Sequence, residues 1–183
     1  MAKWAMVTGP TAGIGAAYAK LLAAKGYNLV LVSRDLKRLK QSAADLTAKH
    51  GVETQVLSAD LTTDKGIATL ADFIAKNEIE VLINNAGTMP LAFWADHAAA
   101  ADAWSRCIDI NFKGVVNGIS AVHDQMIEQG RGQVVNISSI YGNVPVAGSA
   151  IYTATKAAVN VLSESLRIES QGRIKVTTVK PTG

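Results

Sequence analysis

The sequence predicts an α/β protein built on a doubly wound parallel sheet, with six strands in the order 3-2-1-4-5-6 and helices on both faces. Two observations support this prediction. Short apolar segments alternate with helical stretches along the whole chain, as in repeated strand–helix–strand units. The apolar segments are also continuous ("LVLV", "VLI", "VVNI") rather than alternating, which is typical of strands buried on both faces.

The expected elements follow one another without a linker or a low-complexity segment. Strands are expected where short runs are rich in β-branched and apolar residues, at 4–8, 28–33, 53–60, 80–87, 132–139 and 174–181. Five helices are expected between them, one ending at about residue 25 and the others at about 35–50, 63–77, 97–129 and 150–171. We therefore expect residues 1–183 to form a single domain.

The composition is that of a globular protein, with 49% hydrophobic and 18% charged residues. No apolar run approaches 18 residues, so we expect no membrane span. The single cysteine, Cys107, excludes an internal disulfide and favours a reducing cytoplasm. We expect it to be a buried structural residue and not a catalytic one.

The charged residues do not indicate a nucleic-acid or a metal site. The net charge is only +3, and the basic cluster at 34–40 is interrupted by leucines and by an aspartate, as on a solvated amphipathic helix. The three histidines, His50, His97 and His123, lack the spacing of metal ligands. We therefore expect neither a nucleic-acid partner nor a bound metal.

A glycine-rich turn, "VTGPTAGIG", follows the first expected strand and opens the first helix. Gly9, Gly13 and Gly15 permit a tight turn there and let a pyrophosphate approach backbone N–H groups at a helix N-terminus. Glycines also occur in ordinary strand-to-helix turns. The position after the first strand favours a dinucleotide-binding (Rossmann) site, to which Thr11 and Ile14 of the same turn would belong.

The end of the second strand indicates which dinucleotide would bind. Ser33 ends this strand and Arg34 follows, and a guanidinium group can form a fork to the extra phosphate of NADP. Asp35 comes next and could serve a ribose if the strand register differed by two residues. Arg34 and Asp35 could also simply begin a solvated helix. The sequence favours NADP(H), with NAD(H) as the alternative.

A tyrosine and a lysine lie one helical turn apart near residue 150. Tyr152 and Lys156 are at positions i and i+4, so their side chains share a helix face. A free tyrosine has a pKa near 10 and is a poor proton donor at neutral pH, but a nearby ammonium group lowers that pKa. The pair could instead lie side by side on a helix surface. With the residues described next, it predicts general acid–base chemistry.

Further polar residues follow the other expected strands. Ser139 ends the fifth strand 13 residues before Tyr152 and could hold a substrate oxygen, whereas Ser138 should point to the opposite face. In "NNAG" (84–87), Asn84 or Asn85 could tie neighbouring strands, and Ala86 and Gly87 would leave room for a cofactor. Asp60, followed by Leu61, could reach an adenine edge or cap the next helix.

Taken together, these motifs resemble those of the short-chain dehydrogenase/reductase family over essentially all 183 residues. "TGPTAGIG" matches the family's TGxxxGxG, "NNAG" is identical to its motif, and Ser139 with "YTATK" matches its Ser…YxxxK. The resemblance implies a fourth catalytic residue, Asn111, which would kink its helix and hold a water for proton relay. Within the family, the chain looks most like the 3-oxoacyl-CoA and hydroxysteroid reductase branch.

The resemblance also implies cofactor contacts, an assembly and a longer C-terminal region. Pro181 and Gly183 would touch the nicotinamide end, and the long helices would form a homodimer or homotetramer. Family members continue with a substrate loop and a seventh strand, which are expected to be absent here. We therefore expect an NADP(H)-dependent oxidoreductase that interconverts a secondary alcohol and a ketone. The alternative is a truncated, catalytically silent cofactor-binding or regulatory module.

Overall fold

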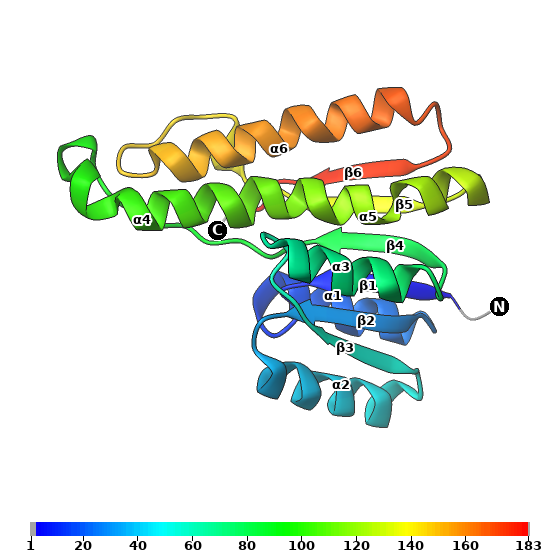
Figure 1. Cartoon of the computed structure of the whole chain (residues 1–183). Helices are drawn as coiled ribbons and strands as arrows, with labels where there is room; N and C mark the ends of the chain where they lie inside the picture. Colours follow the sequence, from blue (N-terminus) through cyan, green and yellow to red (C-terminus); the bar gives the residue numbers. More distant parts are fainter. Residues whose placement is uncertain (1–2, 183) are drawn as a thin grey trace.

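The sheet of this protein has six parallel strands in the order β3-β2-β1-β4-β5-β6. The computed structural model describes residues 3–182, and Figure 1 shows the strands side by side with helices packed around them. The strands are β1 (Trp4–Thr8), β2 (Asn28–Ser33), β3 (Thr54–Ser58), β4 (Ile79–Asn84), β5 (Gln133–Ile137) and β6 (Lys175–Val179). The predicted doubly wound sheet and its strand order are confirmed.

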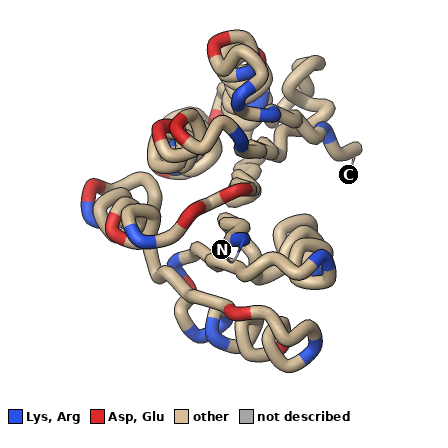
Figure 2. The backbone as a smooth tube through the Cα atoms, turned by 90° about the vertical axis from the view of Figure 1, so that its right-hand side faces the viewer, with Lys and Arg blue, Asp and Glu red and all other residues tan. Residues whose placement is uncertain are grey.

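Helices cover both faces of the sheet, and Figure 2 shows them end-on at either side. One group connects β1, β2 and β3, namely α1 (Gly13–Ala24) and α2 (Leu36–His50). The other connects β3 to β6 and consists of α3 (Asp64–Ile74), α4 (His97–Ile108), α5 (Gly114–Gln129) and α6 (Ala150–Glu169). Helices α1 and α2 pack on one face and α3, α5 and α6 on the other, because right-handed crossovers that cross the sheet in opposite directions place their helices on opposite faces.

The continuous apolar strands are explained by this double coverage. Met6 of β1 packs in the cluster that includes α3, α5 and α6, whereas its neighbour Val7 packs in the cluster that includes α1 and α2. Both side chains are fully buried. Successive residues of a strand point to opposite faces, so a strand with helices on both sides needs an apolar residue at every position.

The long helix predicted at 97–129 is interrupted. A π-helical turn (Asp109–Lys113) separates α4 from α5, at the position of Asn111, where the family resemblance implied a kink. Four strands also end two or three residues earlier than predicted, with β3 ending at Ser58, β4 at Asn84, β5 at Ile137 and β6 at Val179. The residues that follow these strands form turns at the carboxyl edge of the sheet.

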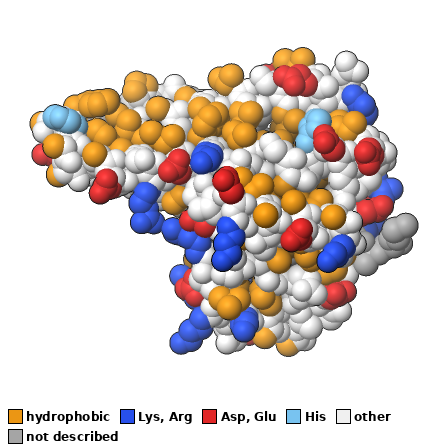
Figure 3. All heavy atoms as spheres, viewed as in Figure 1, with side chains coloured by type: hydrophobic (Ala, Val, Ile, Leu, Met, Phe, Trp, Pro, Cys, Tyr) orange, Lys and Arg blue, Asp and Glu red, His pale blue; other side chains and the backbone are white. Residues whose placement is uncertain are grey.

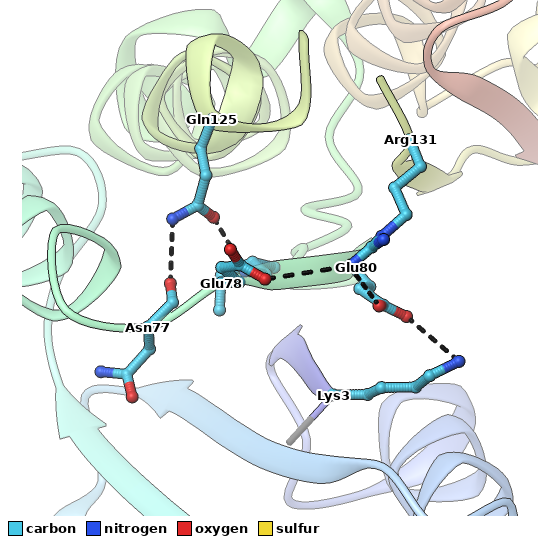
Figure 4. A network of polar contacts seen from close by, with 7 residues as sticks. Lys3, Asn77, Glu78, Glu80, Gln125 and Arg131 are labelled. Atoms are coloured by element: carbon cyan, nitrogen blue, oxygen red, sulfur yellow. Dashed lines mark hydrogen bonds and ion pairs between the residues drawn. The ribbon is translucent and has the colours of Figure 1, made fainter. Parts of the chain in front are cut away.

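A polar network ties the elements together at the opposite, amino edge of β4 (Figure 4). The Gln125 side chain of α5 accepts a hydrogen bond of 2.8 Å from the Ile79 backbone N–H and donates one of 3.0 Å to the Asn77 carbonyl oxygen. Glu80 forms ion pairs with Arg131 at 3.3 Å and with Lys3 at 3.8 Å. These contacts fix the ends of β4 and α5 and lie away from the carboxyl edge.

No helix within residues 3–182 has both the length and the apolar character needed to cross a membrane.

Candidate functional site

Two adjoining cavities lie at the carboxyl edge of the sheet. The larger, of about 640 Å³, is lined by residues that follow β1, β2, β3 and β4 and by part of α4. The smaller, of about 360 Å³, is lined by Ser139, Tyr152 and Lys156 among others. Gly87 and Thr88 line both cavities, so the two form one crevice. A doubly wound sheet binds its ligands at this edge, where the strand order reverses between β1 and β4.

The glycine turn after β1 is closely packed against the loop that follows β4. Gly9 has a φ of +63°, and a Cβ atom built on it would lie 3.0 Å from the Cα atom of Ala86. A Cβ atom on Gly15 would overlap the carbonyl group of Gly9. Gly13 also has a positive φ, of +54°, but faces open space. The turn therefore needs glycine for close backbone approach at Gly9 and Gly15, and for backbone conformation at Gly9 and Gly13.

Thr8, the last residue of β1, connects this turn to β4, and the sequence analysis did not identify it. Its buried hydroxyl oxygen accepts hydrogen bonds of 3.0 Å from the backbone N–H groups of Asn85 and Ala86. The Asn85 side chain in turn donates to the carbonyl oxygens of Thr8 and Gly9, at 3.2 and 2.9 Å. A buried hydroxyl at the end of an otherwise apolar strand is the signal that could have identified it.

The residues at the end of β2 and directly after it lie where the NADP(H) prediction places them. Ser33 and Arg34 line the larger cavity. Asp35 is instead the N-cap of α2, where its carboxylate accepts a hydrogen bond of 3.0 Å from the Arg38 backbone N–H. The Arg38 guanidinium also donates to the carbonyl oxygen of Thr11 at 3.3 Å, which links α2 to the glycine turn. Asp35 thus has a structural role as the cap of α2, which argues against the alternative in which it binds a ribose.

Asp60 faces the larger cavity together with Leu61. One carboxylate oxygen of Asp60 accepts hydrogen bonds from the backbone N–H and the hydroxyl of Thr62, at 3.0 and 2.7 Å. These two bonds, and to a smaller extent the positive charges of Arg34 and Arg106, hold the pKa of the Asp60 carboxyl below its usual range. The capping alternative for Asp60 is wrong, because the N-cap of α3 is Thr63.

Lys156 is a buried cation at the floor of the smaller cavity. Only 5% of the residue is exposed, and its Nζ atom donates a hydrogen bond of 2.7 Å to the carbonyl oxygen of Ile137. Burial lowers the pKa of Lys156 to about 8. The Nζ atom lies 5.6 Å from the centre of the Tyr152 ring, so the structure brings the predicted phenol and ammonium groups together.

Ser139 lies on the same cavity as this pair. Its hydroxyl oxygen accepts a hydrogen bond of 3.1 Å from the Tyr141 backbone N–H, which fixes the side chain at the start of a 3₁₀ turn. The Tyr141 ring stands edge-on to the Tyr152 ring at a centroid distance of 6.3 Å. Ser138 lines the same cavity, but its buried hydroxyl donates to the carbonyl oxygen of Lys156, which gives it a structural contact.

Asn111 lies at the centre of the π-helical turn and is fully buried. Its side-chain oxygen accepts from the backbone N–H of Thr88 at 2.8 Å, and its amide donates to the Thr88 carbonyl oxygen at 2.9 Å and to Thr155 Oγ1 at 3.2 Å. A Cβ atom on Gly87 would lie 3.3 Å from the Asn111 oxygen and 3.7 Å from Lys156 Nζ. The structure therefore places Asn111 beside the Tyr–Lys pair, with the helix widened around it.

The other predicted residues are distributed along the crevice. Ile14, Asn85 and Pro181 line the smaller cavity, and Ala86 lines the larger one. Thr11, Gly13 and Gly15 belong to the glycine turn but do not line either cavity. Gly183 lies outside the described residues. Within residues 3–182 no group of three or more histidine, cysteine, aspartate or glutamate side chains is placed to hold a metal ion.

The crevice fits a dinucleotide beside a proton-transfer site. Its larger part offers close backbone approach at the glycine turn, an arginine for a phosphate and an open acceptor at Asp60. Its smaller part holds a phenol, a hydroxyl and a buried ammonium group, which together can deliver a proton to a bound oxygen and hold that oxygen in place.

Comparisons with known proteins agree with this chemistry. The sequence model of a family described as short chain dehydrogenase matches residues 3–183. The chain is 37% identical over 180 residues to sulfoacetaldehyde reductase 2 of Chromohalobacter salexigens. This match covers 96% of this chain and 70% of that relative. It is 35% identical over 185 residues to very-long-chain 3-oxoacyl-CoA reductase of Mus musculus, covering 99% of this chain and 59% of that relative.

Solved structures share the whole described architecture. A short-chain dehydrogenase from Sphingobium yanoikuyae in complex with NADPH superimposes with a TM-score of 0.92 at 36% identity, covering 100% of this chain and 72% of that one. A bulky-bulky ketone specific alcohol dehydrogenase from Comamonas testosteroni superimposes with a TM-score of 0.91 at 34% identity, covering 100% and 73% of the two chains.

Proposed function

Because this chain belongs to the short-chain dehydrogenase family, we propose that it is an NADP(H)-dependent oxidoreductase that interconverts a secondary alcohol and a ketone. The observation that supports this proposal most is the buried ammonium group of Lys156, 5.6 Å from the centre of the Tyr152 ring, in a cavity shared with Ser139. A surface pair would leave the lysine in water, whereas this pair lies at the junction with the dinucleotide crevice.

The described residues fit NADP(H) along the whole crevice. The glycine turn at Gly9 and Gly15 leaves room for a pyrophosphate, and Arg34 would bind the additional phosphate. Asp60 and Leu61 would hold the adenine end, and Pro181 would contact the nicotinamide end. The bound dinucleotide would supply the hydride for the carbonyl carbon.

The protein side of the reaction is proton transfer and orientation. We assign Tyr152 as the general acid, which gives its phenolic proton to the carbonyl oxygen during reduction and takes it back during oxidation. Ser139, held by the Tyr141 backbone, would donate a hydrogen bond to the same oxygen. The positive charge of Lys156 favours the phenolate that Tyr152 leaves behind.

Asn111 would serve proton supply to this pair. Its side chain is held by both backbone groups of Thr88, and the π turn brings it next to Lys156 across Gly87. A residue in this position can hold a water between the lysine and solvent. Protons lost from Tyr152 could then be replaced without opening the crevice.

The choice of NADP(H) over NAD(H) depends on Arg34. Arg34 lines the larger cavity, while Asp35, the residue that could have served a ribose, caps α2. The structural neighbour from Sphingobium yanoikuyae is described in complex with NADPH. Both observations favour the phosphorylated cofactor.

We also propose that the protein is a homodimer or homotetramer of a reducing cytoplasm. Figure 3 shows hydrophobic side chains gathered along α4 and α5, where 45% of Ile108 is exposed. Helix α6 exposes Val161 and Ile168. Apolar helix faces of this kind favour association, and the free, buried Cys107 suits a reducing compartment. Analytical ultracentrifugation at micromolar concentration should show an oligomer, and a monomer would contradict the assembly.

The test of the function is loss of NADPH absorbance with a panel of ketones that includes 3-oxoacyl thioesters and oxosteroids. Wild-type protein should oxidise NADPH with at least one of them. Tyr152→Phe should lower kcat by about 10²- to 10⁴-fold, the range of general acid catalysis, with little change in the Kd of NADPH. Tight NADPH binding without turnover of any ketone would instead support a silent cofactor-binding module, and a fully active Tyr152→Phe would remove the tyrosine from the mechanism.

A further inference from the structure

Arg106 lines the larger cavity from the side opposite the strand ends. It belongs to a row with Ala103, Ile110 and Gly114, spaced by three or four residues along α4, the π turn and α5. Residues at this spacing share one face of a helix. This face of α4 therefore forms a wall of the crevice, and Arg106 supplies the positive charge on that wall.

Arg106 differs from the arginines outside the crevice in that its guanidinium group has no protein partner within residues 3–182. The chain has six arginines. The four outside the cavity, Arg38, Arg131, Arg167 and Arg173, each donate to a carbonyl oxygen or pair with a carboxylate. Within residues 3–182, the guanidinium groups of Arg34 and Arg106 form no such hydrogen bond or ion pair. The two arginines whose guanidinium groups have no protein partner within residues 3–182 are thus the two that line the crevice.

Asp60 lies close to Arg106 without being bound to it. The charge of Arg106 helps to lower the pKa of the Asp60 carboxyl, after the larger effects of the Thr62 hydrogen bonds and of Arg34. No ion pair joins Asp60 and Arg106 within the described part of the chain. Both hydrogen bonds from Thr62 reach the same carboxylate oxygen, Oδ1. The other oxygen, Oδ2, therefore remains as an acceptor beside the cavity.

The neighbourhood of Arg106 suits a flat aromatic base better than a phosphate. Ile110 on its own helix face and Val32 and Leu61 across the cavity are apolar, which suits the faces of an aromatic ring. A planar guanidinium group stacks on aromatic rings, and a carboxylate oxygen accepts from an exocyclic amino group. Arg34, by contrast, directly follows β2, the strand next to β1 and its glycine turn, where phosphates are expected.

We propose that Arg106 is a cofactor-binding residue whose guanidinium group covers the adenine ring, so that it contributes equally to the binding of NADPH and of NADH. Arg34 alone would distinguish the two cofactors. This inference rests on the proposed function and adds a second, non-selective arginine on α4 to the same site. It also makes α4 part of the cofactor site rather than only a support for Asn111.

Calorimetric titration of the purified protein with NADPH and with NADH tests this role without requiring turnover. In Arg106→Gln the Kd of both cofactors should rise about 3- to 10-fold, the size of a cation–aromatic contact. The ratio of the two Kd values should stay within about 2-fold of the wild-type ratio. The matched control is Lys65→Gln, which removes one charge from an exposed position on the first turn of α3 outside the cavity and should leave both Kd values unchanged.

Arg106→Lys keeps the positive charge, and it serves as the test variant if Arg106→Gln does not fold. It lacks the planar group, and both Kd values should again rise. Wild-type affinity for both cofactors in Arg106→Lys or Arg106→Gln would overturn the proposal, as would a loss confined to NADPH, which would make Arg106 a phosphate ligand. If the wild-type protein binds neither cofactor, the proposed function fails together with this inference. If the wild-type protein binds both cofactors and the Arg106 variants bind them equally well, only this inference fails.

Discussion

The ammonium group of Lys156 lies 5.6 Å from the centre of the Tyr152 ring and donates its hydrogen bond to the Ile137 carbonyl oxygen. The lysine is therefore held by β5 while its charge faces the tyrosine one helical turn away. Burial of this cation destabilises its charged form. The site thus contains a charge that is unfavourable for folding and that the proposed mechanism uses for proton transfer.

This cost predicts a pH-dependent stability. The pKa of Lys156 is lowered to about 8 in the folded protein, whereas an unperturbed lysine titrates at about 10.4. Between these two values the unfolded chain binds more protons, so this group makes the free energy of unfolding rise with pH. Below pH 8 the lysine is charged in both states, and the folded protein bears the full cost of burying it.

Lys156→Met should therefore be more stable than wild type at pH 7, by about 2 kcal/mol after allowance for the lost hydrogen bond. The difference should shrink as the pH rises from about 8 to about 10.4, because the wild-type lysine then loses its charge. Urea denaturation at pH 7 and pH 10 measures both values, with the exposed Lys65→Met as control. A variant less stable than wild type at pH 7, or a difference independent of pH, would argue against a destabilising buried charge.

Removing the Thr8 hydroxyl should have a purely structural effect on the site. In Thr8→Val the backbone N–H groups of Asn85 and Ala86 lose their acceptor. Leaving these two half-buried donors without an acceptor should lower the free energy of unfolding by about 1–3 kcal/mol and weaken NADPH binding. Thr8→Ser keeps the hydroxyl and should recover most of both. Chemical denaturation and calorimetric titration of the pair separate loss of the hydroxyl from loss of the methyl group, and equal behaviour of the two variants would rule out the hydrogen-bonding role.

Gly15 of the glycine turn and Gly26, which lies between α1 and β2, should respond differently to alanine. A Cβ atom on Gly15 would overlap the carbonyl of Gly9, so Gly15→Ala must displace the turn. It should raise the Kd of NADPH by at least about 10-fold, because one hydrogen-bonded phosphate contact is worth about 1.5–3 kcal/mol. Gly26 has a φ of +82° but faces open space, so Gly26→Ala should cost about 1 kcal/mol of stability with unchanged binding. Normal NADPH affinity in Gly15→Ala would contradict the close approach.

Much of the sheet and its motifs could be predicted because their signals are local. The order of strands and helices, with the continuous apolar runs, indicated a doubly wound sheet, and the family resemblance indicated Asn111. The resemblance also indicated a kink at Asn111, but not its form as a π turn with the side chain bonded to Thr88, 23 residues earlier in the chain.

The functional candidates that the sequence analysis missed depend on contacts between distant segments. Thr8 opens the TGxxxGxG motif, but the motif alone gave it no role, and its hydroxyl contacts residues 77 and 78 positions away. Arg106 looked like an ordinary helix residue, because only the folded structure shows that α4 lines the same cavity as the residues that end β2 and follow β3. The spacing of Ala103, Arg106 and Ile110 is compatible with any helix face, so the sequence alone could not show which face meets the crevice.

The central claim, that this crevice binds NADP(H) through Arg34, is tested most directly by calorimetric titration of wild type and Arg34→Gln with NADPH and with NADH. A charged phosphate contact worth about 1.5–3 kcal/mol predicts that the wild-type protein prefers NADPH by roughly 10- to 150-fold. Arg34→Gln should lose most of this preference while keeping its affinity for NADH. Equal affinity of the wild-type protein for the two cofactors, or binding of neither, would contradict the account.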